Sequence, residues 1–252
     1  SPADSQVVGG YHFLKVLDDS EVAYVLASRS NNDDAYMVGK IAVSQIQNLI
    51  IAYKERFDRN NFFQNLILDN LLLVDIYNRA QKLHIEVEGP RIVYLVETRL
   101  EKDSSGMELL RSLFSSQNGD YITAVDEKNI ILIKAVERDA SPESLELVAN
   151  TIVDMMNSEA MLKVRVSYGT VVQELREVSK SYKEAKLALD VGKIFFSEKD
   201  IVAYTTLGIG RLIYQLPMSL CEMFIAEIFG ERKLDLDDET LVTVSYTHLR
   251  AH

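Results

Sequence analysis

The stretch Lys163–Gly169 (KVRVSYG), together with the residues that follow it, decides the fold of this chain. Its apolar residues alternate with polar ones, the period of a strand with one buried face, and Gly169 ends the run. The alternating apolar residues are Val164, Val166 and Tyr168. From Val171 to Phe196 the apolar positions recur every three, four or seven residues, which predicts a core-facing helix. Its small residues, Ala185, Ala188 and Gly192, predict close packing of this helix on a sheet.

The helix sequence SYKEAKLALDVGK (Ser181–Lys193) is followed by DIVAY at residues 200–204 and by TLGIGRLIYQLP at residues 206–217. This combination resembles the GGDEF-like middle domain of the PucR/CdaR family of bacterial transcription regulators, over roughly residues 85–240. The resemblance implies an α/β (α+β) fold with a degenerate nucleotide-cyclase-like palm. A helical stalk and a partial α/β sensor domain would precede the palm.

Composition limits the class of protein. The chain has 252 residues, 47% of them hydrophobic, enough for one large domain or two small ones. Apolar runs such as Leu71–Val74 are far shorter than the ~20 residues that span a bilayer, and the first ten residues lack the pattern of a signal peptide. A single cysteine, Cys221, fits a reducing cytoplasm, and its apolar neighbours predict a buried thiol. The formal charge of −11 argues against nucleic-acid binding by this stretch.

Both ends are expected to be those of a fragment. The last nine residues, Val244–His252 (VSYTHLRAH), look like the translation of a transposon adapter from sequencing-library preparation, so we exclude residues 244–252 and their two histidines from fold reasoning. The start, Ser1–Asp4 (SPAD), looks like the interior of a loop. The resemblance implies a helix-turn-helix beyond Thr243, which this chain does not contain.

Residues 1–34 are predicted to be the C-terminal part of the sensor domain. Two strand-like runs, Tyr11–Val16 and Val22–Ala27, flank the turn-rich segment LDDSE and predict a hairpin. Gly9 and Gly10 are interpreted as loop glycines rather than as a place of close approach to a ligand.

Residues 35–84 are predicted to be a helical linker and dimerisation stalk. Asp33 or Asp34 would cap a helix over residues 35–57, and a second helix would run from Asn60 or Asn61 to Leu83. The first helix has an apolar stripe of Ala42, Ile46, Leu49, Tyr53 and Phe57, widened by Val43 and Ile50. The hairpin cannot cover this surface, so the helices pack either on a second copy or on one another. If the stalk forms a dimer, Val43→Glu or Ile50→Glu should break it.

Residues 85–206 are predicted to be the GGDEF-like domain, after a linker at His84–Pro90. The expected order is a strand at 91–99, a helix at 107–114, a hairpin of 121–125 and 129–136, and a helix opened by Ser141 and Pro142 that runs to Met156. With the opening stretch and a last strand at 200–204 this gives β-α-β-β-α-β-α-β. Residues 207–243 would be a helical connector with helices at 211–216 and 220–229 and a last one capped by Asp237 or Asp238.

The hairpin allows a test for diguanylate cyclase activity. Cyclases of this type carry a Gly-Gly-Asp/Glu-Glu-Phe turn, whose glycines let the backbone approach the nucleotide while acids hold Mg²⁺. The corresponding turn here is Asp126-Glu127-Lys128-Asn129, which keeps two acids but neither the glycines nor the aromatic residue. The nearest acid on the first strand is Glu97. We therefore interpret Asp126 and Glu127 as solvated turn residues and expect no enzyme activity.

Other sites are not indicated by the sequence. It has no phosphate-binding loop and no nucleophile elbow, and Gly208-Ile209-Gly210 lacks the third glycine of a dinucleotide fingerprint. His12 and His84, and Lys82 beside the latter, have no cysteine pairs with which to form a zinc site. We assign no catalytic, cofactor-binding or metal-binding residues and no cofactor.

By resemblance, the protein is predicted to be a cytoplasmic, ligand-responsive transcription regulator that works as a homodimer and does not contact a membrane. The resemblance implies a small-molecule inducer, often a sugar diacid or a purine-pathway compound, and DNA contact through the C-terminal domain outside this chain. Two alternatives stay open: a nucleotide-binding or vestigial cyclase-like enzyme domain, and an adaptor that acts through protein contacts.

Overall fold

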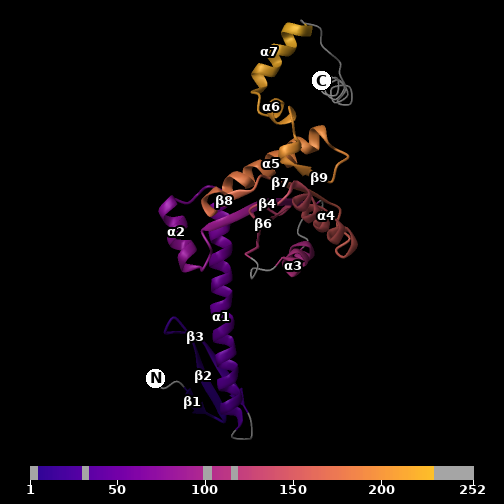
Figure 1. Cartoon of the computed structure of the whole chain (residues 1–252). Helices are drawn as coiled ribbons and strands as arrows, with labels where there is room; N and C mark the ends of the chain where they lie inside the picture. Colours follow the sequence, from indigo (N-terminus) through magenta and orange to yellow (C-terminus); the bar gives the residue numbers. More distant parts are fainter. Residues whose placement is uncertain (1–4, 30–33, 99–103, 115–118, 230–252) are drawn as a thin grey trace. The chain divides into compact units, whose positions relative to one another are not determined.

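A computed structural model describes residues 5–29, 34–98, 104–114 and 119–229 (Figure 1). The chain divides into two compact units, Ser1–Phe62 and Phe63–His252, which we treat separately. The predicted adapter-derived tail at 244–252, the helix capped by Asp237 or Asp238, and the start at Ser1–Asp4 lie outside the described residues.

The first unit contains a three-stranded antiparallel sheet in the order β1-β2-β3. The strands are β1 (Ser5–Val8), β2 (Tyr11–Asp18) and β3 (Glu21–Arg29). The predicted hairpin is confirmed, with Asp19 and Ser20 both at positive φ as a tight two-residue turn requires. The sequence analysis missed β1. Gly9 and Gly10 form its turn to β2, with φ of 58° and 80°, a conformation that glycine adopts without strain.

Helix α1 (Asp34–Ile67) is a single helix of 34 residues, so the predicted break near Asn60 is wrong. Residues 57–63 contain no proline or glycine, and asparagine costs less than about 0.7 kcal/mol in a helix interior. The Glu55–Arg59 ion pair, at 2.8 Å, also spans this point. The helix ends at Ile67, and Asp69, two residues later, has a φ of 63°. There the N–H groups of Asp69 and Asn70 donate to the carbonyls of Leu66 and Asn65, the pattern of a Schellman motif.

The second unit has a mixed sheet in the order β5-β6-β4-β7-β9, with β8 paired to β4. Its strands are β4 (Glu88–Thr98), β5 (Tyr121–Ala124), β6 (Asn129–Ala135), β7 (Val164–Tyr168), β8 (Val172–Glu174) and β9 (Ile201–Ala203). Only the β7–β9 pair is parallel among the described strands. The predicted β-α-β-β-α-β-α-β order is confirmed, and β8 is an addition to it.

Helices lie on both faces of this sheet. Residues of α3 (Ser104–Leu113) and α4 (Pro142–Ser158) form a core with Ile92, Tyr94 and Val96 of β4. The Ser141 side chain caps α4 by accepting from the Ser144 N–H, and Pro142 begins the helix, as predicted. The opposite face of β4 meets α5 (Val178–Phe195).

The helix predicted from Val171 begins later than expected. Residues Val172–Glu174 form β8 and pair with β4, a 3-10 turn covers Leu175–Glu177, and α5 begins at Val178. Val171 and Leu175 are four residues apart, which fits a helical period by coincidence. A strand as short as β8 has too few alternating residues to be distinguished from a helix in the sequence. The close packing predicted from small residues is confirmed, since a Cβ on Gly192 would lie 2.8 Å from Val202 Cγ2.

Two other expectations need correction. The predicted linker punctuation, Gly89 and Pro90, lies inside β4, where the register with β8 shifts between Glu88 and Arg91. Proline fits there because a bulge does not need its missing N–H. The link from α2 (Leu73–Lys82) to β4 is therefore shorter than predicted. Cys221, predicted to be buried, is partly exposed on α7 (Met218–Phe229), whose described residues are largely uncovered.

Helix α6 (Gly210–Tyr214) precedes α7, in agreement with the predicted helical connector, and Pro217 separates the two. Among the helices of the described segments, none combines the length and the apolar character needed to cross a bilayer.

Candidate functional site

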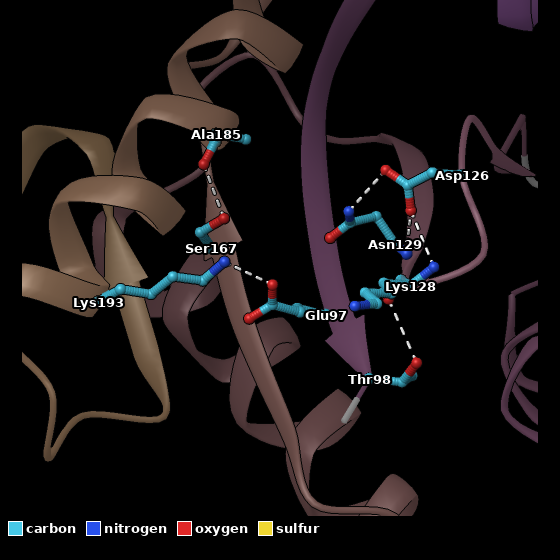
Figure 2. A network of polar contacts seen from close by, with 8 residues as sticks. All are labelled: Glu97, Thr98, Asp126, Lys128, Asn129, Ser167, Ala185 and Lys193. Carbon is cyan, nitrogen blue, oxygen red and sulfur yellow. Dashed lines mark hydrogen bonds and ion pairs between the residues drawn. The ribbon is translucent and has the colours of Figure 1, made fainter. Parts of the chain in front are cut away.

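The corner where β4 ends and the β5–β6 hairpin turns holds the residues that the sequence analysis compared with a cyclase site (Figure 2). Glu97 lies directly opposite Asn129 in the β4–β6 ladder. Thr98, the last residue of β4, donates its backbone N–H to the Lys128 carbonyl at 2.9 Å, and its hydroxyl donates to the same oxygen at 3.2 Å. The fold thus brings Glu97 and the turn 126–129 to one corner of the sheet.

Asp126 uses both of its carboxylate oxygens within its own turn. Oδ1 accepts from the backbone N–H groups of Lys128 and Asn129, at 2.9 and 2.7 Å, and Oδ2 accepts from Asn129 Nδ2 at 2.8 Å. Partial burial would raise the pKa of this carboxyl, but the hydrogen bonds from Asn129 and Lys128 outweigh that effect and lower the pKa. Asp126 is therefore a charged turn former, and not simply a solvated residue as predicted.

Glu97 is also engaged. Its carboxylate forms an ion pair with Lys193 Nζ at 2.5 Å, with the Glu97 side chain 23% exposed. Lys193 belongs to the last turns of α5, and the sequence analysis quoted it without giving it a role. Since β4 and α5 are distant in sequence, no local pattern could reveal this pair.

Two described acids of this corner, Asp126 and Glu97, already have partners. Mg²⁺ needs several oxygen ligands that are free to face it. Asp126 is bonded within its turn, Glu97 is neutralised by Lys193, and the described residues include no group of three histidine, cysteine, aspartate or glutamate side chains placed to share a metal. Glu127 is exposed, and so is His84, which ends α2 with a φ of 54°.

The helix motif SYKEAK (residues 181–186) has a structural role where α5 packs on the sheet. Ser181 is fully buried, and its Oγ accepts from the Val93 N–H of β4 at 3.0 Å and donates to the Thr170 carbonyl at 2.8 Å. Glu184 accepts from both the N–H and the hydroxyl of Thr170. A Cβ on Gly169 would lie 2.2 Å from the Ser181 carbonyl oxygen, so only glycine fits at this crossing. Ser167 likewise donates to the Ala185 carbonyl, at 2.7 Å.

These hydrogen bonds explain why α5 can lie so close to the sheet. Val93 lies between the residues of β4 that pair with β7 and those that pair with β8, so its N–H has no strand partner on that side. A buried backbone N–H without a partner is costly. Ser181 supplies that partner. The most recognisable stretch of the sequence therefore fixes α5 against the sheet.

The remaining predicted positions lie elsewhere. His12 is on β2, with its ring centre 6.1 Å from that of Tyr36, and its Nδ1 is buried without a hydrogen-bond partner in the described structure. Gly208, with a φ of 53°, and Gly210 lie at the turn into α6. The structure does not bring these residues together with the corner of Glu97 and Asp126 in a single site.

No curated protein matches the chain. A solved structure described as a regulator of polyketide synthase expression from Bifidobacterium adolescentis aligns with 77% of this chain and 74% of its own, at 12% identity and a TM-score of 0.46. An overlay of that quality does not by itself establish a shared fold or function. The family model described as a GGDEF-like domain matches residues 70–191, a range that includes the hairpin and most of α5. These residues are therefore similar to a GGDEF-like domain, and the match overlaps the range 85–206 predicted from the sequence.

Proposed function

We propose that this chain is the sensing and transmitting part of a cytoplasmic transcription regulator of the PucR/CdaR type, in which the GGDEF-like domain is catalytically silent. The observation that carries the proposal is the state of Asp126. Both of its oxygens accept hydrogen bonds from Lys128 and Asn129, so this acid is already engaged within its own turn.

Chemistry supports a silent domain. A nucleotide that enters such a corner needs a backbone without side chains at the turn and acids that are free to bind Mg²⁺. This turn has Lys128 and Asn129 in place of small residues, and Lys193 already neutralises Glu97. Opening the site would break the hydrogen bonds of Asp126 and the ion pair of Glu97 together.

The regulatory role follows from the silent domain and the charge of the chain. A net charge of −11 disfavours contact with phosphates, so DNA would be bound by a domain outside this sequence. A small-molecule inducer would shift the protein between two arrangements only by the difference in its affinity for them. We propose the helices α1 and α2 as the element that differs between those arrangements, in a homodimer.

Nucleotide chemistry is the first test. The chain is incubated with GTP and Mg²⁺, cyclic dinucleotide formation is followed by chromatography, and GTP binding is measured by calorimetry. We expect no product and no binding at micromolar concentration. Micromolar GTP binding that is lost in Lys193→Ala would overturn the silent assignment and favour a nucleotide-binding domain.

The gene supplies the second test. We expect the genomic reading frame to continue past Thr243 into a basic helix-turn-helix. A natural stop codon shortly after that point, or a following domain with no basic helices, would replace the regulator by an adaptor that acts through protein contacts.

A further inference from the structure

Arg91 of β4 places a charged side chain in the interior of the second unit. The residue is 4% exposed. Its hydrogen-bond partners in the described structure are backbone carbonyls: Nη1 donates to Gly89 at 3.2 Å and Nη2 donates to Glu86 at 2.7 Å. Nε is buried and has no acceptor there. Burial lowers the pKa of Arg91, and the charges of Tyr121 and Glu86 offset this effect only in part.

This environment is unfavourable for a guanidinium. Arginine stays protonated at neutral pH, so Arg91 buries a charge that no carboxylate contacts among the described residues. Removing a charge from water is costly unless the charge is paired and its donors are satisfied. The two carbonyls offset part of that cost, and Nε remains unsatisfied. A movement that lets water reach Arg91 is therefore favoured at this position.

The carbonyls that hold Arg91 belong to the link between α2 and β4. The Ile85 N–H donates to a carbonyl of α2 at 2.8 Å, so the chain up to Ile85 is bound to the helix. The Val87 carbonyl accepts at 2.9 Å from the 3-10 turn that follows β8, so the chain from Val87 onward is bound to the sheet. Glu86 lies between these two parts, and its carbonyl accepts the shorter of the two bonds from Arg91. The guanidinium therefore lies at the boundary between helix and sheet.

We call residues 73–85, which comprise α2 and the start of the link, the flap. Its buried residues are few and apolar: Ile76, Ala80, Leu83 and Ile85. Its other large apolar residues are between 40% and 68% exposed: Leu73, Val74 and Tyr77. Segments with few buried apolar contacts open at a lower free-energy cost than the core of a domain. The flap is thus weakly held, next to a charge that its closure keeps from water.

We infer that the flap opens within a single chain, and that the buried guanidinium of Arg91 sets the balance between its closed and open positions. The inference deepens the proposed function, on which its use in signalling rests, because α2 belongs there to the element that differs between two arrangements. A ligand can shift a population only by its difference in affinity for the two states. A buried charge that destabilises the closed position brings the two states close enough in free energy for a small difference to suffice.

A purely structural role for Arg91 makes the opposite prediction. If Arg91 only held the link in place, its removal would loosen the flap. Glu86 is exposed and Gly89 is half-buried, so water close to their carbonyls can take the place of the guanidinium. Losing the two hydrogen bonds is therefore a smaller change than losing the buried charge, and we expect removal of Arg91 to tighten the flap.

Hydrogen exchange of the full chain, measured by mass spectrometry on peptides that cover residues 73–85, tests the sign. Arg91→Met keeps an unbranched chain without the charge, and it should slow exchange of the flap by about tenfold. Arg91→Lys keeps the charge, so its flap should exchange as fast as in the wild-type chain or faster. The control is Arg165→Met on β7, because Arg165 also donates to a carbonyl, that of Ser197, but is only half-buried. It should leave exchange of the flap unchanged.

Three results would overturn the inference. Faster or unchanged exchange in Arg91→Met would show that the charge does not favour opening. An Arg91→Met chain that is unfolded by circular dichroism would show that Arg91 holds the fold together. Equal slowing in Arg91→Met and Arg91→Lys would assign the effect to the size of the side chain rather than to its charge.

Trypsin gives a second readout of the same opening. Arg79 and Lys82 are exposed residues of α2, and cleavage of a folded protein at such sites follows the population of the open form. Cleavage after either residue should slow by a similar factor in Arg91→Met. Cleavage after Lys199, an exposed residue beyond α5, should keep its rate. Equal cleavage of the flap in the wild-type chain and in Arg91→Met would contradict the inference.

The outcomes are separable from those of the proposed function. If Arg91→Met slows exchange of the flap but the reading frame lacks a DNA-binding domain, the flap stands and the regulator does not. If the DNA-binding domain is present and Arg91→Met speeds exchange, the regulator stands and the flap does not.

Discussion

Helices α1 and α5 have similar apolar patterns and opposite surroundings. In α5, nine residues are buried against the sheet or its neighbours. In α1, the one buried residue between Met37 and Phe57 is Gly39, while Leu49 and Tyr53 are 68% and 73% exposed. A helical period of apolar residues therefore predicts that one face of the helix packs against another surface. It does not tell whether the covering surface belongs to the same chain.

The largest expected difference between the two helices is at two leucines, one in each helix. Leu189 of α5 is 2% exposed, and Leu189→Ala should lower the free energy of unfolding by about 2–5 kcal/mol because it leaves a cavity. Leu49→Ala should change it by no more than about 0.5 kcal/mol in dilute solution. Urea denaturation followed by circular dichroism measures both.

Repeating that measurement at high concentration sharpens the result. If a second copy covers α1 in the proposed homodimer, Leu49→Ala should become costly only where wild-type chains associate. A large cost in dilute solution would instead mean that Leu49 is covered within its own chain.

The crossing of α5 and the sheet should tolerate no side chain at Gly169. Gly169→Ala should cost about 3 kcal/mol, since the new Cβ would meet the Ser181 carbonyl and backbone would have to move. Gly106→Ala in α3 is the control. Its Cβ meets Met156 and Leu162 side chains at 3.2–3.5 Å, and alanine favours the helix. Similar thermal shifts in the two variants would show that the crossing is looser than the structure indicates.

Removing the hydroxyl of Ser181 should have a smaller effect. Ser181→Ala leaves the Val93 N–H of β4 buried without its acceptor, a loss of about 1–3 kcal/mol. Ser112→Ala, at an exposed serine that bonds only to its own helix turn, should be nearly neutral. Hydrogen exchange at Val93 provides the direct measurement, with faster exchange expected in Ser181→Ala alone.

The smallest expected effect concerns the turn. Asp126 has a lowered pKa, so its contribution is complete at neutral pH and is lost as the pH falls through the folded pKa, which lies below the ordinary aspartate value. Asp126→Ala should cost about 0.5–1.5 kcal/mol at pH 7, and this cost should shrink as acid protonates the carboxylate. Glu127→Ala should be neutral at every pH. A pH-independent cost for Asp126→Ala would assign its role to shape rather than charge.

Local signals predicted much of the fold. The alternation in β7 and the cap of α4 by Ser141 and Pro142 depend on neighbours in sequence, and both are confirmed. The end of α1 was placed wrongly because asparagine only weakens a helix. The Schellman motif at Asp69 needs a residue in the left-handed region, which aspartate adopts more often than most residues but which its presence marks only weakly. Strand β8 was missed because three residues carry too little pattern.

The candidate site was predictable only in part. The missing glycines of the hairpin could be read from Asp126-Glu127-Lys128-Asn129, and the GGDEF-like match agrees with the domain inferred from SYKEAK. The pairing of Glu97 with Lys193 could not be read from the sequence, because it joins residues 96 positions apart. Nor did the sequence reveal that Asp126 is bonded within its turn, which depends on the backbone geometry there.

The hydrogen bonds of Asp126 have a consequence for the life of the protein in the cell. A loop whose shape depends on a bound ion is complete only after that ion arrives, and it loosens when supply falls. Here Lys128 and Asn129 provide what an ion would otherwise provide, so the hairpin acquires its shape as soon as the chain folds. Its behaviour should be the same in cells starved of magnesium and in cells rich in it.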